Sequence, residues 1–174
     1  MFTHDYTIYG SHATKLKFLA KQDNKPYYFR RYIDVYMNAV VFGLLYNQKA
    51  VRDDKNDRAR IYADAFSKES DKCELLFKLV MLLDETSNLS TDERLNRAFR
   101  DASSGNTEKI KQNMDLFNQY VLGGIDILYE KLTNGCVSQD DYNKRIIDLM
   151  ENFEAEFTGN DIKDKINKLL TEDD

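Results

Sequence analysis

A stretch of almost continuous apolar side chains extends from Val35 to Tyr46. Within it only Asn38 is strongly polar, and Gly43 alone lacks a side chain. A surface helix shows a single apolar stripe, whereas this stretch is apolar on nearly all sides, which predicts a buried helix. We expect a central helix over about residues 27–48. We expect Gly43 to mark a close crossing by another helix and Asn38 to bond across to a neighbouring helix.

Weaker patterns predict the elements around this helix. Apolar side chains at helical spacing predict further helices, and a capping box of Ser90 with Glu93 marks the start of one of them. The stretch 61–66 is open between a helical turn and a short strand. The other expected elements are an extended arm (1–13), a short helix (14–22), a charged loop (51–60) and a second buried helix (70–84).

The longest expected helix begins at Thr107. Its apolar residues recur at intervals of three or four, which predicts a narrow seam for one helical partner. They are Ile110, Met114, Phe117, Val121, Ile125, Leu128 and Leu132. The next helix repeats this spacing after the turn Asn134-Gly135, so we expect a long antiparallel hairpin over about residues 107–157. Gly123-Gly124 within the first helix predicts a kink or a close helix contact.

Composition supports an all-α fold. The chain has 174 residues, one Pro and seven Gly. This length favours one domain, and so few turn residues argue against a sandwich or a barrel. We therefore expect a single helical domain, residues 1–174, with six or seven helices around the central one and a frayed end at 172–174.

Charge is distributed unevenly along the chain. The net charge is −5, but residues 15–60 carry eleven Lys or Arg against five Asp, and residues 61–174 carry fourteen against twenty-four Asp or Glu. The excess of basic residues in segment 15–60 can bind an anionic partner. The alternative is that the two halves face each other or are simply solvated.

The basic residues of segment 15–60 are interspersed with aromatic ones, including Phe18, Tyr27 and Tyr28. Basic side chains bind phosphate, and aromatic rings stack on unpaired bases. The candidate nucleic-acid-binding residues are Lys17, Lys21, Lys25, Arg30, Arg31, Arg58 and Arg60. The alternative is that the tyrosines pack against the core and the lysines lie on the surface.

Motifs for catalysis, cofactors and metals are missing from the sequence. Neither a nucleophile elbow nor a phosphate-binding glycine loop occurs, and residues 51–60 fail the calcium-loop pattern. We therefore expect no cofactor, no metal and no catalytic residue. An enzyme with a site made of Asp34, Tyr32 and Arg31 ranks last among our hypotheses.

Features that bear on location point to the cytoplasm. No stretch reaches the length of a membrane span, and the first residues do not resemble a signal peptide. Cys73 and Cys136 are far apart and form no disulfide framework, so we expect reduced thiols, with Cys73 in the core and Cys136 in a loop.

A resemblance to a known family rests on the stretch from Tyr32 to Met37, together with Ala39, Gly43 and the following NQKAVRD. It resembles the small uncharacterised proteins that accompany bacterial DNA-phosphorothioation defence clusters. The resemblance covers about residues 27–53, and the later helices have no counterpart in it. It implies a place in a DNA-linked defence system and does not imply an activity.

Two binding hypotheses follow. The first is a non-catalytic accessory protein of a DNA-associated bacterial system, which contacts DNA or a DNA-bound protein complex through the basic N-terminal face. The second is a protein interaction module or homo-oligomer that uses the helical hairpin 107–157 and makes no nucleic-acid contact.

Overall fold

The computed structural model of the chain describes residues 2–20, 28–156, 164 and 167. This part of the chain forms seven α-helices, one short 3-10 helix and one antiparallel two-stranded sheet. The predicted all-α bundle is therefore confirmed, with the small sheet as an addition. The elements are β1 (Tyr6–Tyr9), α1 (Gly10–Leu19), α2 (Tyr32–Leu45), β2 (Arg58–Ile61), α3 (Ala63–Lys68), α4 (Ser70–Leu83), α5 (Thr91–Phe99), a 3-10 helix (Asp101–Ser103), α6 (Thr107–Thr133) and α7 (Gln139–Glu156).

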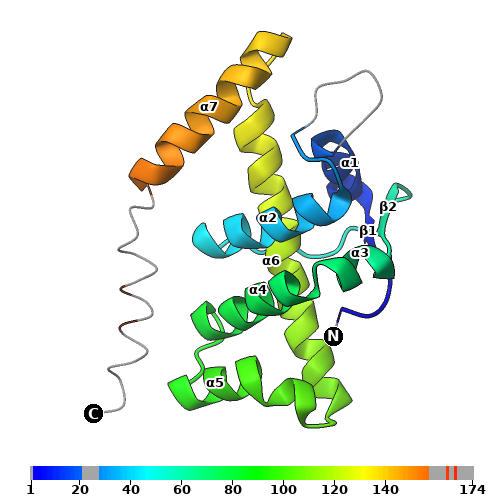
Figure 1. Cartoon of the computed structure of the whole chain (residues 1–174), viewed down its shortest axis with the longest axis vertical. Coiled ribbons are helices and arrows are strands. Elements are labelled where there is room, and N and C mark those ends of the chain that lie inside the picture. The colour runs from blue at the N-terminus through cyan, green and yellow to red at the C-terminus, as the bar shows by residue number, and fades with distance from the viewer. Residues whose placement is uncertain (1, 21–27, 157–163, 165–166, 168–174) are drawn as a thin grey trace.

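Helix α6 runs the length of the molecule, and α2 crosses its middle (Figure 1). At the crossing the two backbones touch through glycines. A Cβ atom at Gly43 would lie 2.1 Å from the Tyr120 carbonyl oxygen, and one at Gly124 would lie 1.7 Å from the Ala39 oxygen. One at Gly123 would lie 2.3 Å from the oxygen of Gln48, in the loop that follows α2. The expectation of a close helix contact at these glycines is confirmed.

The seam on α6 has a different partner from the one expected. Phe117, Val121 and Ile125 are fully buried, but α6 packs most extensively against α2, and α7 covers only its C-terminal part. Figure 1 shows α7 diverging from α6 beyond the turn that joins them. The physical reason is that α2, apolar on nearly all sides and bearing Gly43, fits the seam more closely than the one-sided α7.

Helix α1 begins at Gly10 rather than at Thr14, because a distant loop caps it. Gly10 adopts φ +61°, its N–H donates to the Asp57 carbonyl, and the Ser11 N–H donates to Asp53 Oδ2 at 2.9 Å. The predicted extended arm is thus limited in the described residues to those before Gly10, and its last four form β1.

The central helix is shorter than expected. It begins at Tyr32, because the N–H groups of Tyr28 and Phe29 both donate to the Leu19 carbonyl and hold this segment outside the helix. It ends at Leu45, and Asn47 follows with φ +49°. Asn38 does not bond across to another helix. It is exposed, and its amide donates to the Asp34 carbonyl one turn earlier.

The charged loop 51–60 ends in a strand. Its last residues form β2, which pairs with β1 in antiparallel register, Tyr9 opposite Arg58 and Tyr6 opposite Ile61. The ambiguous stretch 61–66 therefore divides, with Ile61 ending β2 and α3 beginning at Ala63. An aromatic cluster fills the space between the sheet and the helices. Its ring centroids lie 5.3 Å (Tyr36–Phe66), 5.9 Å (Tyr36–Phe117) and 5.8 Å (Phe77–Phe117) apart.

Some predictions lie outside the described residues. These are the fraying at 172–174, the expected end of the short helix at residues 21–22, the start of the central helix at residue 27 and the end of the hairpin at residue 157.

Candidate functional site

Five basic residues of the predicted segments lie on one side of the described part of the molecule. Helix α1 carries Lys17 and packs against β2, which carries Arg58 and Arg60. Arg30 and Arg31 directly precede α2, whose first turns lie beside α1 (Figure 1). Lys21 and Lys25 lie outside the described residues. The structure therefore places five of the seven candidates. They come from α1, from the segment before α2 and from β2.

Strand β2 directs its arginines to solvent. Side chains alternate along a strand, so Ala59 and Ile61 are buried while Arg58 and Arg60 are exposed. The Arg58 guanidinium lies 5.4 Å from the ring centroid of Tyr9, and the Arg52 guanidinium stacks on the same ring at 3.9 Å. This arginine–tyrosine cluster was not predicted, because Tyr9 and Arg52 become neighbours only when the sheet forms.

Three of the five candidates are paired with acids. Lys17 bonds to Asp57, Arg31 Nη2 lies 2.6 Å from Asp34 Oδ1 and 2.8 Å from Glu69 Oε1, and Arg60 Nη1 lies 3.8 Å from Asp5 Oδ2. Hydrogen bonds from Lys17 and then Thr14 lower the pKa of Asp57, so this carboxylate is ionised at neutral pH. Pairing reduces the local positive charge that these three residues offer.

Arg30, Lys55 and Arg58 differ from the paired residues. All three are exposed, and none forms an ion pair with an acidic side chain within the described ranges. Among the described residues of this side, they are exposed cations that remain available to an anionic ligand. Lys55 was not among the predicted site residues, although it lies in the basic segment that the sequence indicated.

Arg31 and Asp34 form the start of α2 and not a catalytic pair. The Asp34 carboxylate accepts the Arg31 N–H at 3.1 Å, which satisfies a free donor of the first turn. The Arg31 guanidinium bridges Asp34 and Glu69, and so ties the start of α2 to the junction of α3 and α4. The Asp34 carboxylate therefore caps the start of the helix, and the Arg31 guanidinium is paired with two acids.

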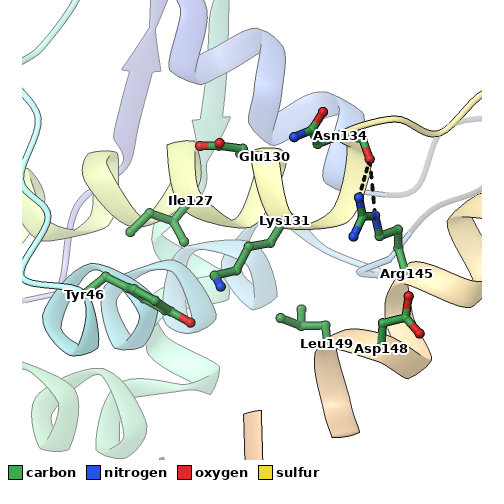
Figure 2. Close-up of a pocket in the computed structure, with 8 residues that line it drawn as sticks. All are labelled: Tyr46, Ile127, Glu130, Lys131, Asn134, Arg145, Asp148 and Leu149. Atoms are coloured by element: carbon green, nitrogen blue, oxygen red, sulfur yellow. Dashed lines mark hydrogen bonds between the residues drawn. The ribbon is translucent and has the colours of Figure 1, made fainter. Parts of the chain in front are cut away.

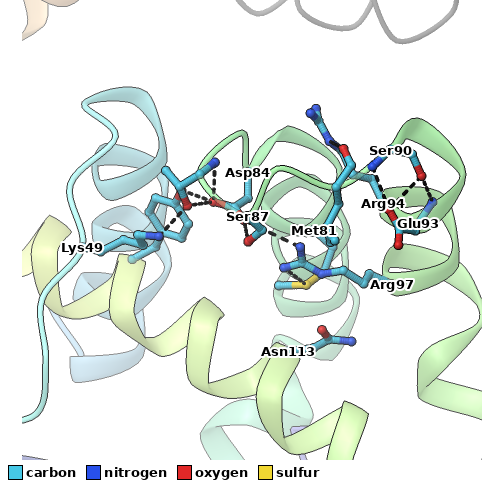
Figure 3. Close-up of polar contacts among 12 residues, drawn as sticks. Lys49, Met81, Asp84, Ser87, Ser90, Glu93, Arg94, Arg97 and Asn113 are labelled. Atoms are coloured by element: carbon cyan, nitrogen blue, oxygen red, sulfur yellow. Dashed lines mark hydrogen bonds and ion pairs between the residues drawn. The ribbon is translucent and has the colours of Figure 1, made fainter. Parts of the chain in front are cut away.

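A buried polar cluster around Asp84 was not predicted (Figure 3). Asp84 is completely buried at the end of α4. It accepts hydrogen bonds from Thr86, from Ser87 and, at 2.7 Å, from Tyr120 Oη. Burial by itself would raise the pKa of Asp84, but the hydroxyl groups of these three residues outweigh it and the pKa is lowered. The only sequence signal is an Asp that ends an apolar helix and precedes Thr and Ser, a turn pattern.

Two cations complete this cluster. Arg97 Nη1 lies 3.6 Å from Asp84 Oδ2, and Lys49 donates to Thr86 Oγ1. The cluster therefore joins α4, α5 and α6 to the loop after α2. Because each Asp84 oxygen is already occupied and the residue has no exposed surface, its geometry fits a structural role.

Two cavities adjoin α7. One, of about 390 Å³, is lined with charged groups, including Lys131, Arg145 and Asp148 (Figure 2). Arg145 directs two N–H groups at the Asn134 carbonyl, at 3.2 and 2.8 Å, and Lys131 Nζ lies 4.4 Å from the Tyr46 ring centroid. Both cations thus already have partners, Arg145 at the end of α6 and Lys131 at the end of α2, which makes this cavity a weak candidate for an anion site.

The other cavity, of about 420 Å³, is an apolar groove between α2 and α7. Leu128 and Leu132 of α6 are among its lining residues, together with Phe42, Met150 and Phe153. We call it the α2–α7 groove. Its polar lining residues are Tyr28, whose hydroxyl donates to the Leu132 carbonyl at 2.6 Å, and Asn38.

The described residues contain neither a cluster of metal ligands nor a helix that could cross a membrane. Among them, no group of three or more His, Cys, Asp or Glu side chains is placed to hold a metal ion. Within the same ranges, no helix has both the length and the apolar character that a membrane crossing requires. Cys73 is buried and Cys136 is partly exposed, and both are free thiols.

Comparison with known proteins adds no relationship. No protein family, no curated protein and no solved structure matches this chain.

Proposed function

We propose that the protein is a non-catalytic accessory factor that binds DNA through its basic N-terminal side. The observation that supports this proposal is the packing of α1 against β2 and beside the start of α2, which brings Lys17, Arg58 and Arg60 to the side where Arg30 and Arg31 lie. The acidic remainder of the chain would otherwise repel a polyanion. A segregated basic surface attracts one despite a net charge of −5.

Arg30, Lys55 and Arg58 are the proposed phosphate contacts. They are exposed and form no ion pair with an acidic side chain of the described part. Tyr9, flanked by Arg52 and Arg58, marks the centre of the proposed surface. Lys17 and Arg60 contribute to the same field, weakened by Asp57 and Asp5. The resemblance to proteins of DNA-phosphorothioation clusters is part of the proposal and suggests a DNA-linked defence setting.

Fluorescence anisotropy tests the proposal. Labelled single- and double-stranded DNA is titrated with the wild-type chain across a salt series, because phosphate contacts make log K fall linearly with log salt concentration. The double variant Lys55→Glu/Arg58→Glu should bind more weakly. Its slope for duplex DNA should be shallower by about 2, which is about 0.9 for each lost phosphate contact.

A matched control separates this surface from a general effect of charge. Lys111 is exposed on the first turns of α6. It is about 22 Å along the helix axis from Asp126, where α1 contacts α6. Lys111→Glu makes the same charge change and should leave binding within twofold of wild type for one reversal. The proposal is contradicted if the wild-type chain does not bind DNA at low salt. It is also contradicted if Lys111→Glu and Lys55→Glu/Arg58→Glu lose the same DNA affinity for each reversed charge.

A further inference from the structure

The α2–α7 groove is an apolar hollow on the described part of the molecule. Nine of its eleven lining residues have apolar side chains. Met150, on the α7 wall of the groove, is 70% exposed. Apolar surface of this kind commonly marks a contact with another segment or another molecule, so the groove calls for an occupant.

The chain that follows α7 carries a matching apolar pattern. Helix α7 ends at Glu156, and Gly159-Asn160 is a turn signal. Apolar side chains then recur at helical spacing, which predicts one apolar helix face over about residues 161–171. They are Ile162, Ile166, Leu169 and Leu170. Asp164 and Asn167, the residues of this stretch that the structure describes, are helical and exposed, as expected for the opposite face.

The length of this segment and its connection to α7 suit the groove. A loop of about four residues, 157–160, joins antiparallel neighbouring helices, so segment 161–171 can return along α7. The α7 residues that line the groove extend from Ile146 to Phe153, which is about 10 Å of helix, and the segment extends about 15 Å. In this arrangement Ile166 lies near the level of Met150.

Charge favours the same contact. Residues 146–156 include four acidic residues and no Lys or Arg, whereas residues 162–171 include three Lys against one Asp. The two helices therefore carry opposite net charges, which attract each other. The short connection also keeps the segment at a high effective concentration beside the groove of its own chain, which favours this groove over that of another copy.

We infer that segment 161–171 forms an amphipathic helix that packs into the α2–α7 groove of its own chain. Ile162, Ile166 and Leu169 then cover Met150 and the apolar residues beside it. The groove is accordingly an internal contact and not a docking site for a separate partner. The inference does not depend on DNA binding, because the proposed phosphate contacts belong to other elements.

Hydrogen exchange of the full chain, followed by mass spectrometry, tests the inference. An isolated helix of about 11 residues is barely stable in water, so slow exchange of the amides of 161–171 requires packing. We expect these amides to exchange about tenfold faster or more in Ile166→Asp than in wild type, because the groove would bury the new carboxylate without a partner. Asn167→Asp adds the same charge on the opposite face and should exchange like wild type.

Substitutions on the α7 side test the same contact. Met150→Asp should release the segment and speed its exchange as Ile166→Asp does. Asn152→Asp is the matched control, because Asn152 is exposed and lies on the opposite side of α7 from Met150. It should leave the exchange of 161–171 unchanged. Circular dichroism confirms folding of every variant.

Four results would overturn the inference. The first is equal exchange of 161–171 in wild type and Ile166→Asp. The second is exchange in Asn167→Asp as fast as in Ile166→Asp, and the third is wild-type exchange in Met150→Asp. The fourth is exchange that slows as the concentration of wild type rises from about 5 to 100 μM, because the segment would then occupy a second copy of the chain.

Discussion

Gly124 of α6 lies directly against the carbonyl group of Ala39 on α2. A Cβ atom at position 124 would stand 1.7 Å from the Ala39 oxygen and 2.5 Å from its carbon. Both are backbone atoms of a buried helix, so neither can move aside alone. The glycine thus sets the distance between the two helices that form the centre of the fold.

Gly124→Ala should therefore destabilise the protein severely. The helices would have to separate, and we expect a loss of about 3 kcal/mol or more in the free energy of unfolding, the upper part of the range for overpacking. For a chain of this size that corresponds to a fall of about 10 °C in the melting temperature. Gly105→Ala is the comparison, because a Cβ there meets nothing within 4 Å. Its positive φ strains an alanine, and this strain of about 1–2 kcal/mol should be the whole cost of the substitution. Equal effects of the two substitutions, measured by thermal and urea unfolding, would argue against this crossing.

Asp84→Asn should destabilise the protein at neutral pH. The substitution removes a buried charge that faces Arg97 and accepts three hydroxyl groups, and we expect a cost of about 3 kcal/mol. Urea unfolding at pH 7 measures it. Glu85→Gln at the adjoining exposed position, which makes the same change from acid to amide, is the control.

The effect of Asp84→Asn should depend on pH. Since the folded-state pKa of Asp84 is lowered, its contribution is complete well above the unfolded-state pKa of about 3.9. It is lost as the pH falls through the folded-state value. The stability difference between wild type and Asp84→Asn should therefore shrink below about pH 4. A difference that is constant from pH 7 to pH 3 would mean that the ionised form is not the stabilising one.

Arg30 and Arg31 should respond differently to charge reversal. Arg31 joins Asp34 and Glu69 at the start of α2, whereas Arg30 is exposed and forms no such bridge. Arg31→Glu should lower the melting temperature, and Arg30→Glu should leave it close to wild type. Differential scanning fluorimetry measures both. DNA affinity is then measured for Arg30→Glu alone. A loss of binding in Arg31→Glu could come from a destabilised fold as well as from a lost DNA contact.

The two cysteines should react at very different rates. Cys73 is buried, and this burial raises the pKa of its thiol to about 11, so little thiolate forms at pH 8. Cys136 is partly exposed in the turn between α6 and α7. A colorimetric thiol reagent should modify one equivalent rapidly and the second only after unfolding. Cys136→Ser should abolish the rapid phase. Rapid modification of both thiols in the folded protein would contradict the burial of Cys73.

The local pattern of the sequence predicted the described helices other than α3, together with several of their ends. The run from Val35 to Tyr46 predicted the buried centre, and the Ser90–Glu93 capping box is present with Ser90 as the cap of α5. The glycines at 43, 123 and 124 predicted a close crossing. These features are local because periodicity and capping depend on residues within one or two turns.

Tertiary structure decided which elements meet. The spacing of Phe117, Val121 and Ile125 predicted a partner for α6 but did not distinguish α2 from α7, since several apolar helices satisfy the same seam. Likewise, the start of α1 at Gly10 depends on Asp53 and Asp57, more than 40 residues away. The charge of the basic side depends in the same way on acids brought to it by folding, as Asp57 is to Lys17. Sequence alone determined the periodic and capping signals, whereas long-range packing and ion pairing required the folded chain.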